Sequence, residues 1–142
     1  MTGLAALTQL RTLVVEDHKA FQNYLCSAIL ERTDTEIVGQ IQNGLEAVEF
    51  AAALKPDLIF LDIGLPGIDG IEAAYRIRRI TPTAKIIFLT QENSPEIVHE
   101  ALRSGALGYV LKSKCHKDLH AAIEAAVLGQ SFVSAGIDGL GL

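Results

Sequence analysis

Short apolar runs alternate along this chain with segments in which apolar residues recur at helical spacing. The runs are rich in Val, Ile, Leu and Phe, as expected for strands that are buried on both faces of a parallel sheet. The predicted strands are Thr12 to Val15, Glu36 to Ile41, Leu58 to Leu61, Lys85 to Leu89 and Gly108 to Leu111. Their alternation with helical segments predicts repeated β-α units.

Helices are predicted between and after these strands. Apolar stripes at i, i+3 and i+4 spacing mark two of them, and we expect both stripes to face the core. The stripes are Phe21, Tyr24, Leu25, Ala28 and Ile29 in the first helix, and Leu119, Ala122, Ile123, Ala126 and Val127 in the last. Turn or cap signals precede three further helices, at Asn43-Gly44, Asp69-Gly70 and Ser94-Pro95. The helix that begins at Pro95 should end at Gly105.

The fold class is therefore α/β, and a chain of this size most simply forms a five-stranded parallel doubly wound sheet. We expect the flavodoxin-like (βα)5 arrangement with strand order 2-1-3-4-5, in which strands 1 and 3 are neighbours at the centre. Residues 11–134 are expected to form one domain. Residues 1–10 are interpreted as an N-terminal extension, and residues 135–142 as a Gly-rich tail that begins a linker.

The balance of charge argues against several classes of partner. The 142 residues include 12 Lys and Arg and 17 Asp and Glu, which gives a formal net charge of -5. No basic run is present, so we expect neither nucleic acid nor an anionic membrane to bind this chain directly. No apolar stretch is long enough to span a bilayer, and Cys26 and Cys115 form no CxxC motif. A cytoplasmic protein with two ordinary thiols is the expectation.

Charged and hydroxyl side chains follow the carboxyl ends of four predicted strands. Strand 1 is followed by Glu16-Asp17, strand 3 by Asp62, strand 4 by Thr90 and strand 5 by Lys112. Ligands of open α/β sheets bind beyond the carboxyl ends of the strands, so these side chains should converge. Three neighbouring carboxylates repel one another unless a cation lies among them, and an oxygen-rich site suits Mg²⁺. Glu16, Asp17 and Asp62 are therefore the predicted metal ligands.

Asp62 is the best placed of these carboxylates to act as a nucleophile, because it follows the central strand. A carboxylate that attacks phosphorus forms an aspartyl phosphate, provided that the charge of the transferred group is neutralised. Mg²⁺ and Lys112 supply that neutralisation, and Thr90 can hydrogen-bond the phosphoryl oxygens. Each residue alone would be read as a cap or a solvated charge. The arrival of all of them from four strand ends favours the phosphoryl site.

Other polar residues are better explained by ordinary structural roles. His116 and His120 lie at i, i+4, but they have no third ligand in sequence and are expected on a solvated helix face. His18 follows the acidic pair and is near enough in sequence to reach the rim of the site, but we expect it at the start of the first helix. A solvated helix face is also expected for a short basic patch, formed by Arg76, Arg78 and Arg79.

The segments LVVEDH, PDLIFLDIGLPGIDGIEA, KIIFLT and GALGYVLKS resemble the receiver domains of bacterial two-component response regulators, from about Arg11 to Ser134. Among receivers, the chain is most similar to those that precede a LuxR-type (NarL/FixJ-like) DNA-binding domain, in the segments NGLEAV, EALRSGALGYVLKS and AAIEAAVLGQSFVS. The resemblance implies that a histidine kinase phosphorylates Asp62, and that the phosphorylated protein forms a homodimer and regulates transcription. It implies a switch rather than an enzyme, with at most slow autodephosphorylation.

The resemblance also assigns roles within the site. Glu16 and Asp17 become the acidic pocket for Mg²⁺ or Mn²⁺, and the backbone carbonyl of Gly64 becomes a further metal ligand. Thr90 and Lys112 become the pair that senses the phosphoryl group. Tyr109 matches an aromatic residue that swings inward when the threonine moves.

Two positions depart from the common receiver pattern. Gln91 stands where a small residue often borders the phosphoryl entrance, which leaves the rate and lifetime of phosphorylation open. Ser113 stands where many receivers have a proline, as the LuxR-type branch commonly has it. No helix-turn-helix follows Ser134, so the expectation is a receiver separated from its output domain, with a stand-alone receiver as the alternative.

Three other functions fit the residues less well. A phosphatase of the haloacid-dehalogenase type needs a second Asp two residues after the nucleophile, where this chain has Gly64. A flavodoxin-like cofactor carrier needs a phosphate loop after strand 1, where Glu16-Asp17 would repel a phosphate. A receiver that has lost phosphorylation would lack part of the acidic site, whereas every expected residue is present.

Overall fold

The computed structural model describes residues 9–137, which form a parallel sheet between two layers of helices. The strands are β1 (Leu10–Val15), β2 (Thr35–Ile41), β3 (Leu58–Leu61), β4 (Lys85–Thr90), β5 (Gly108–Leu111) and β6 (Phe132–Val133). Their order in the sheet is β2-β1-β3-β4-β5-β6, and every neighbouring pair is parallel. The α/β class and the order of the first five strands agree with the prediction.

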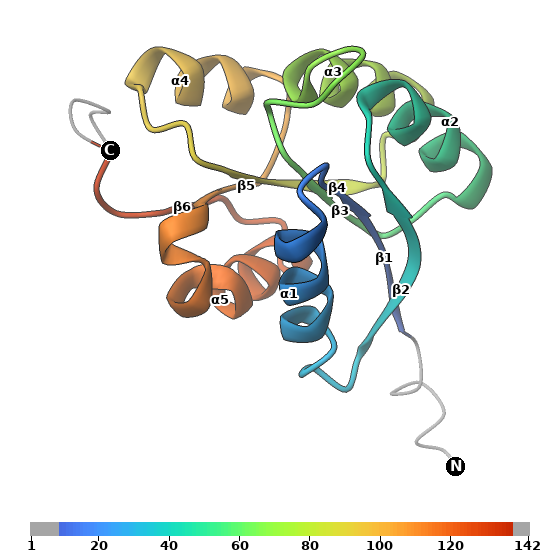
Figure 1. Cartoon of the computed structure of the whole chain (residues 1–142), viewed down its shortest axis with the longest axis horizontal. Helices are drawn as coiled ribbons and strands as arrows, with labels where there is room; N and C mark the ends of the chain where they lie inside the picture. Colours follow the sequence, from blue (N-terminus) through green and yellow to red (C-terminus); the bar gives the residue numbers. More distant parts are fainter. Residues whose placement is uncertain (1–8, 138–142) are drawn as a thin grey trace.

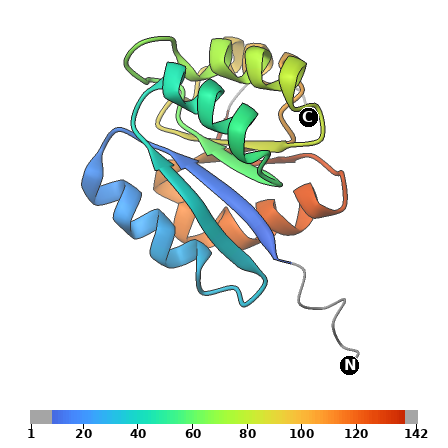
Figure 2. The same ribbon diagram turned by 90° about the vertical axis from the view of Figure 1, so that its right-hand side faces the viewer.

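Five helices cover the two faces of this sheet. They are α1 (Lys19–Ile29), α2 (Gly44–Leu54), α3 (Gly70–Ile80), α4 (Pro95–Arg103) and α5 (Cys115–Val127). Figure 1 shows α2, α3 and α4 on one face and α1 and α5 on the other, and the two buried apolar clusters follow the same division. Figure 2 shows the same layers from the side. Strands buried on both faces explain the nearly continuous apolar runs of the sequence.

The predicted core stripes are correct in their centres and too wide at their edges. Leu25, Ile29 and Ile123 are almost fully buried, as expected. Tyr24 and Val127 are instead 44% and 40% exposed, because each lies at the margin of its helix's apolar face. The thiols of Cys26 and Cys115 are free and buried.

The helix boundaries follow the predicted capping residues. The side chains of Asn43, Asp69 and Ser94 each accept a hydrogen bond from the backbone N–H three residues later. Pro95 occupies the first turn of α4, and Gly105 adopts a left-handed φ of 94° just after that helix. These caps satisfy N–H groups that the first turn of a helix leaves unpaired.

The prediction of five strands was wrong by one, since Phe132–Val133 adds β6 to the edge of β5. The backbone N–H of Ser134 donates to the carbonyl of Tyr109 at 2.9 Å. The hydroxyl of Ser134 donates to Asp118 Oδ2 at 2.7 Å and accepts the N–H of Leu111 at 3.1 Å. A strand of two residues carries no periodicity of its own, so these tertiary bonds had no signal in the sequence.

The ends of the chain set the limits of the description. β1 begins at Leu10, the last residue of the predicted N-terminal extension. Residues 1–8 of that extension and residues 138–142 of the predicted tail lie outside the described residues. Between residues 9 and 137, none of the helices has the length and apolar character needed to cross a membrane.

Candidate functional site at the carboxyl edge of the sheet

The strand register brings the predicted site residues to one edge. Val15 at the end of β1 pairs with Leu61 at the end of β3, and the N–H of Asp62 donates to the carbonyl of Val15 at 3.1 Å. Glu16 and Asp62 therefore leave the sheet side by side. Thr90 ends β4, next to the last residue of β5, so Lys112 follows on the same edge.

The acidic side chains form one compact cluster. One carboxylate oxygen from each of Glu16, Asp17 and Asp62 and one ring nitrogen of His18 all lie within 4.8 Å of one another. Glu16 and Asp62 are 1% and 6% exposed, so water screens their charges poorly. Asp17 Oδ1 is buried and has no hydrogen-bond partner among residues 9–137. A buried carboxylate oxygen without a partner is unfavourable unless a cation or a donor meets it.

Lys112 partly neutralises this cluster. Its ammonium lies 2.8 Å from Glu16 Oε1 and 3.0 Å from Asp62 Oδ2. Burial opposes the charged ammonium, but the hydrogen bonds and negative charges of these two carboxylates outweigh it and raise the pKa of Lys112. The ammonium also lies 4.8 Å from the centre of the Phe21 ring, which covers it from the side of α1. Lys112 is therefore charged and held against the acidic cluster.

Asp62 is fixed by its own surroundings. Its Oδ1 accepts the N–H of Ile63 at 2.7 Å, while Oδ2 accepts the ammonium of Lys112. The backbone of α3 packs closely against Asp62 at Gly70, where a Cβ would lie 2.0 Å from the carbonyl oxygen of Asp62. This close approach of α3 had no signal in the sequence beyond the expected turn at Asp69-Gly70.

Thr90 and Tyr109 meet at the backbone of Glu92. The hydroxyl of Thr90 accepts the N–H of Glu92 at 3.3 Å, and the hydroxyl of Tyr109 donates to the carbonyl of Glu92 at 2.8 Å. Tyr109 is fully buried, and its ring centre lies 6.2 Å from that of Phe88. Burial, with the nearby charges of Glu92 and Asp62, raises the pKa of the Tyr109 phenol. Tyr109 is thus in the inward position.

A small hollow of about 110 Å³ opens beside Asp62. Its walls are His18, Asp62, Gly64, Thr90, Gln91, Glu92 and Lys112. Gly64 is exposed, and a Cβ there would meet open space. The hollow has room for a small group next to a buried carboxylate, an ammonium and a hydroxyl.

The structure changes the interpretation of His18. It is the N-cap residue of α1, as expected, but its side chain makes no capping hydrogen bond. Its Nδ1 lies instead 3.2 Å from Glu16 Oε2 and 3.6 Å from Asp17 Oδ1. Its position next to Glu16-Asp17 was visible in the sequence, but the direction of the ring was not.

The other polar candidates stay apart from this edge. His116 is exposed, and His120 faces Glu31 across the surface at 3.4 Å. Within the described part of the chain, the cluster around Asp62 is the single group of three or more side chains with metal-ligand spacing. On α3, Arg76 pairs with Glu72 at 2.9 Å and Arg79 is exposed, as expected of a solvated face.

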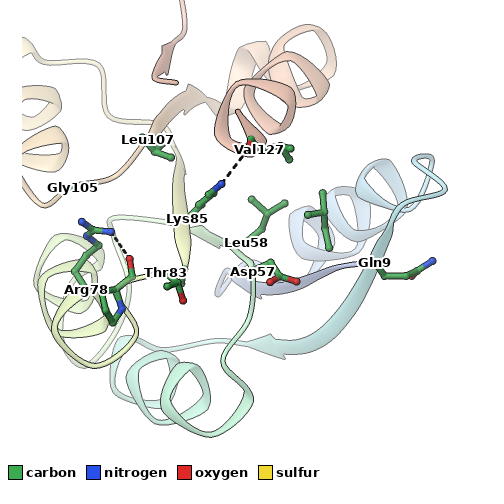
Figure 3. Close-up of a pocket in the computed structure, with 12 residues that line it drawn as sticks. Gln9, Asp57, Leu58, Arg78, Thr83, Lys85, Gly105, Leu107 and Val127 are labelled. Carbon is green, nitrogen blue, oxygen red and sulfur yellow. Dashed lines mark hydrogen bonds between the residues drawn. The ribbon is translucent and has the colours of Figure 1, made fainter. Parts of the chain in front are cut away.

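A larger hollow of about 600 Å³ lies at the opposite, amino edge of the sheet (Figure 3). Its cationic groups bond backbone carbonyls: Arg78 donates to Pro82 at 2.9 Å, and Lys85 donates to Val127 at 3.2 Å. Leu58 and Leu107 add apolar wall. These cations cap the loop after α3 and the end of α5, so this hollow lacks the convergent reactive groups of the carboxyl edge.

Two curated bacterial regulators are similar to this chain in sequence. LiaR, a transcriptional regulatory protein of Bacillus subtilis (strain 168), is 33% identical over 130 residues, which are 92% of this chain and 62% of LiaR. NarL, the nitrate/nitrite response regulator protein of Escherichia coli (strain K12), is 33% identical over 125 residues, 88% of this chain and 58% of NarL. The chain thus spans about three fifths of the length of these curated relatives.

A solved structure gives the same result at the level of the fold. The crystal structure of a two-component response regulator of the LuxR family from Aurantimonas sp. SI85-9A1 superposes with a TM-score of 0.86 and 31% identity. The match covers 91% of this chain and 92% of that one. Residues 12–124 match the family described as response regulator receiver domain. With its four strand ends meeting around Asp62, and with relatives of the LuxR and NarL type, the chain belongs to the response regulator receiver domain family.

Proposed function

We propose that this chain is a phosphorylation switch of a two-component system, which takes a phosphoryl group from a histidine kinase onto Asp62. The observation that carries the proposal is the position of Asp62. It is a buried carboxylate at the mouth of the 110 Å³ hollow, with the Lys112 ammonium 3.0 Å away and Glu16-Asp17 beside it.

The groups at this edge of the sheet can carry out the phosphoryl transfer. A carboxylate oxygen of Asp62 forms the new bond to phosphorus, and the bond from phosphorus to the imidazole nitrogen of the kinase breaks. The leaving imidazole keeps the electron pair and takes up a proton. Lys112 remains next to the charge that arrives, and the Thr90 hydroxyl is free to donate to a phosphoryl oxygen while it accepts the N–H of Glu92.

The residues present fit a divalent metal ion. Three carboxylates converge, and the buried Asp17 Oδ1 has no partner in the described part of the chain. Oxygen ligands of this kind suit Mg²⁺, or Mn²⁺ in its place, and we assign Glu16, Asp17, Asp62 and the carbonyl of Gly64 to it. The ion, when bound, neutralises the negative charge that gathers as the phosphoryl group arrives.

The output proposed for the switch is transcription. LiaR is described as a transcriptional regulatory protein and NarL as a response regulator, and this chain spans only part of each. We propose that phosphorylation favours a homodimer and controls a LuxR-type DNA-binding domain, and that the receiver itself does not bind DNA. A stand-alone receiver that acts through protein contacts is the second candidate. In both cases the chain is a switch with slow dephosphorylation rather than an enzyme that turns over substrate.

The test is phosphorylation by acetyl phosphate, followed by intact-protein mass spectrometry. The wild-type chain should gain one phosphoryl group with Mg²⁺ and none with a chelator. Reduction of the acyl phosphate with borohydride and peptide mapping should locate the modification at Asp62. Incorporation that is independent of divalent metal, or that maps to another residue, would contradict the proposal.

A further inference from the structure

The side chain of His18 belongs to the edge that holds the acidic cluster. Its backbone N–H donates to Glu16 Oε2 at 3.0 Å, and its Nδ1 lies 3.2 Å from the same oxygen. The ring makes no capping bond to α1, although His18 stands at the N-cap position. Helix capping therefore does not explain where this ring points.

The ring also faces the carboxylate oxygen that lacks a partner. His18 Nδ1 is 3.6 Å from Asp17 Oδ1, which is buried and accepts no hydrogen bond within residues 9–137. A ring nitrogen of His18 and one oxygen each from Glu16, Asp17 and Asp62 lie within 4.8 Å of one another. That spacing allows a single ion to reach all four groups.

Lys112 does not occupy the carboxylate oxygens that His18 faces, so an ion can approach the cluster from the side of His18. Lys112 occupies Glu16 Oε1 and Asp62 Oδ2, which are oxygens on its own side of the cluster. His18 meets Glu16 through the other oxygen, Oε2. The imidazole is 69% exposed, so it can turn toward an ion without disturbing the core.

We propose that His18 supplies a nitrogen ligand to the metal site and thereby shifts its preference from Mg²⁺ toward a transition ion such as Mn²⁺. This inference rests on the proposed phosphorylation function, because it concerns the same metal site. Mg²⁺ strongly prefers oxygen ligands, whereas imidazole nitrogen binds first-row transition ions more tightly. A site with three carboxylates and one imidazole is therefore expected to distinguish the two ions more sharply than an all-oxygen site.

The test compares the wild type with His18→Asn, which replaces the ring nitrogen by an amide and keeps the backbone N–H to Glu16. Asn is also a favourable N-cap, so the unfolding midpoint without metal should not fall. Calorimetric titrations should show that Mn²⁺ affinity falls about tenfold, whereas Mg²⁺ affinity changes by less than about threefold. Pulsed electron paramagnetic resonance of bound Mn²⁺ should show ¹⁴N coupling in the wild type and none in His18→Asn.

The matched control is His120→Asn, which removes a partly exposed histidine of α5 that faces Glu31 and is not part of the acidic cluster. This variant should keep both the ¹⁴N coupling and the wild-type ratio of affinities. If His18→Asn keeps that coupling and ratio, or if His120→Asn loses them, His18 is not the ligand. A wild type that is phosphorylated with Mg²⁺ yet shows no ¹⁴N coupling to Mn²⁺ overturns the His18 assignment alone. A wild type that binds neither ion and is not phosphorylated overturns the proposed function as well.

Discussion

The two edges of the sheet carry similar residues and use them differently. β3 lies between Asp57 at its amino end and Asp62 at its carboxyl end, and lysines lie at both edges, as Lys85 and Lys112. At the amino edge, Asp57 Oδ2 accepts the backbone N–H of Arg11 at 2.8 Å, and Lys85 donates to the carbonyl of Val127. At the carboxyl edge, Lys112 bonds Asp62 and Glu16 directly.

The two edges differ in whether their charged side chains can exchange hydrogen-bond partners. Side chains bonded to backbone groups fix loops and helix ends, and they lose those bonds if they turn to a ligand. Side chains bonded to one another can exchange partners when an ion or an anionic group arrives. The volume of a hollow is therefore a poor guide to the functional site of this protein. The hollow of about 600 Å³ at the amino edge lacks charged side chains that bond one another, whereas the hollow of about 110 Å³ at the carboxyl edge has them.

The largest expected effect separates the two aspartates. Asp62→Asn should abolish phosphorylation by acetyl phosphate, because an amide cannot form the acyl phosphate. Asp57→Asn should be phosphorylated at the wild-type rate, with a loss of about 1 kcal/mol in the free energy of unfolding from its weakened bond to Arg11. Intact-protein mass spectrometry and urea denaturation measure the two effects. Equal phosphorylation of both variants would remove the distinction between the edges.

The second contrast concerns the two lysines. Lys112→Met leaves the buried carboxylates of Glu16 and Asp62 without their cation, which should lower the free energy of unfolding by about 3 kcal/mol. Lys85→Met removes one partly exposed bond to a carbonyl and should cost less than about 1 kcal/mol. Because the pKa of Lys112 is raised, its contribution is complete at neutral pH and is lost only as the pH rises through that raised pKa.

Urea denaturation at pH 7, with and without Mg²⁺, measures this contrast. Added Mg²⁺ should recover more stability in Lys112→Met than in Lys85→Met, because the ion replaces the missing positive charge beside Glu16 and Asp62. A similar loss in both variants would mean that Lys112 is an ordinary surface charge.

Local signals account for the parts of the fold that the sequence predicted. The apolar runs gave five strands, and the caps at Asn43, Asp69 and Ser94 gave helix starts that the structure confirms. Strand β6 was missed because two residues carry no pattern and depend on bonds to β5. The bonds of Ser134 to Asp118 and Leu111 join segments that only the folded chain brings together.

The site was predictable in composition and less so in contacts. The position of each group after a strand follows from the parallel sheet, so the convergence of Glu16, Asp62 and Lys112 could be expected. The pairing of Lys112 with Glu16 at 2.8 Å and the turn of His18 toward Asp17 depend on side-chain conformation. No spacing in a sequence reports a rotamer, which is why the interpretation of His18 had to change.

The third prediction concerns the repulsion within the acidic cluster. Asp17→Asn removes one negative charge and supplies an amide that can donate to Glu16, so it should raise the free energy of unfolding without metal by about 1 kcal/mol. The further stabilisation by Mg²⁺ should be smaller than in the wild type. Asp69→Asn is the control, because Asn caps a helix as well as Asp and Asp69 is not one of the clustered carboxylates. Thermal unfolding with a series of Mg²⁺ concentrations measures both quantities, and unchanged metal stabilisation in Asp17→Asn would count against the pocket.

The smallest effect is expected in the relay from Asp62 to Tyr109. The hydroxyl of Thr90 accepts the N–H of Glu92, and the hydroxyl of Tyr109 donates to the carbonyl of Glu92. A phosphoryl group that accepts a hydrogen bond from Thr90 therefore also stabilises the inward position of Tyr109. Thr90→Ala should weaken that state by about 1 kcal/mol, which is roughly a fivefold change in the ratio of the two states. Thr90→Ser keeps the hydroxyl and should behave as the wild type. Light scattering with beryllofluoride, a phosphoryl mimic, should show less dimer for Thr90→Ala than for Thr90→Ser. If the two variants dimerise equally, the hydroxyl plays no part in the switch, and Tyr109 is an ordinary core residue.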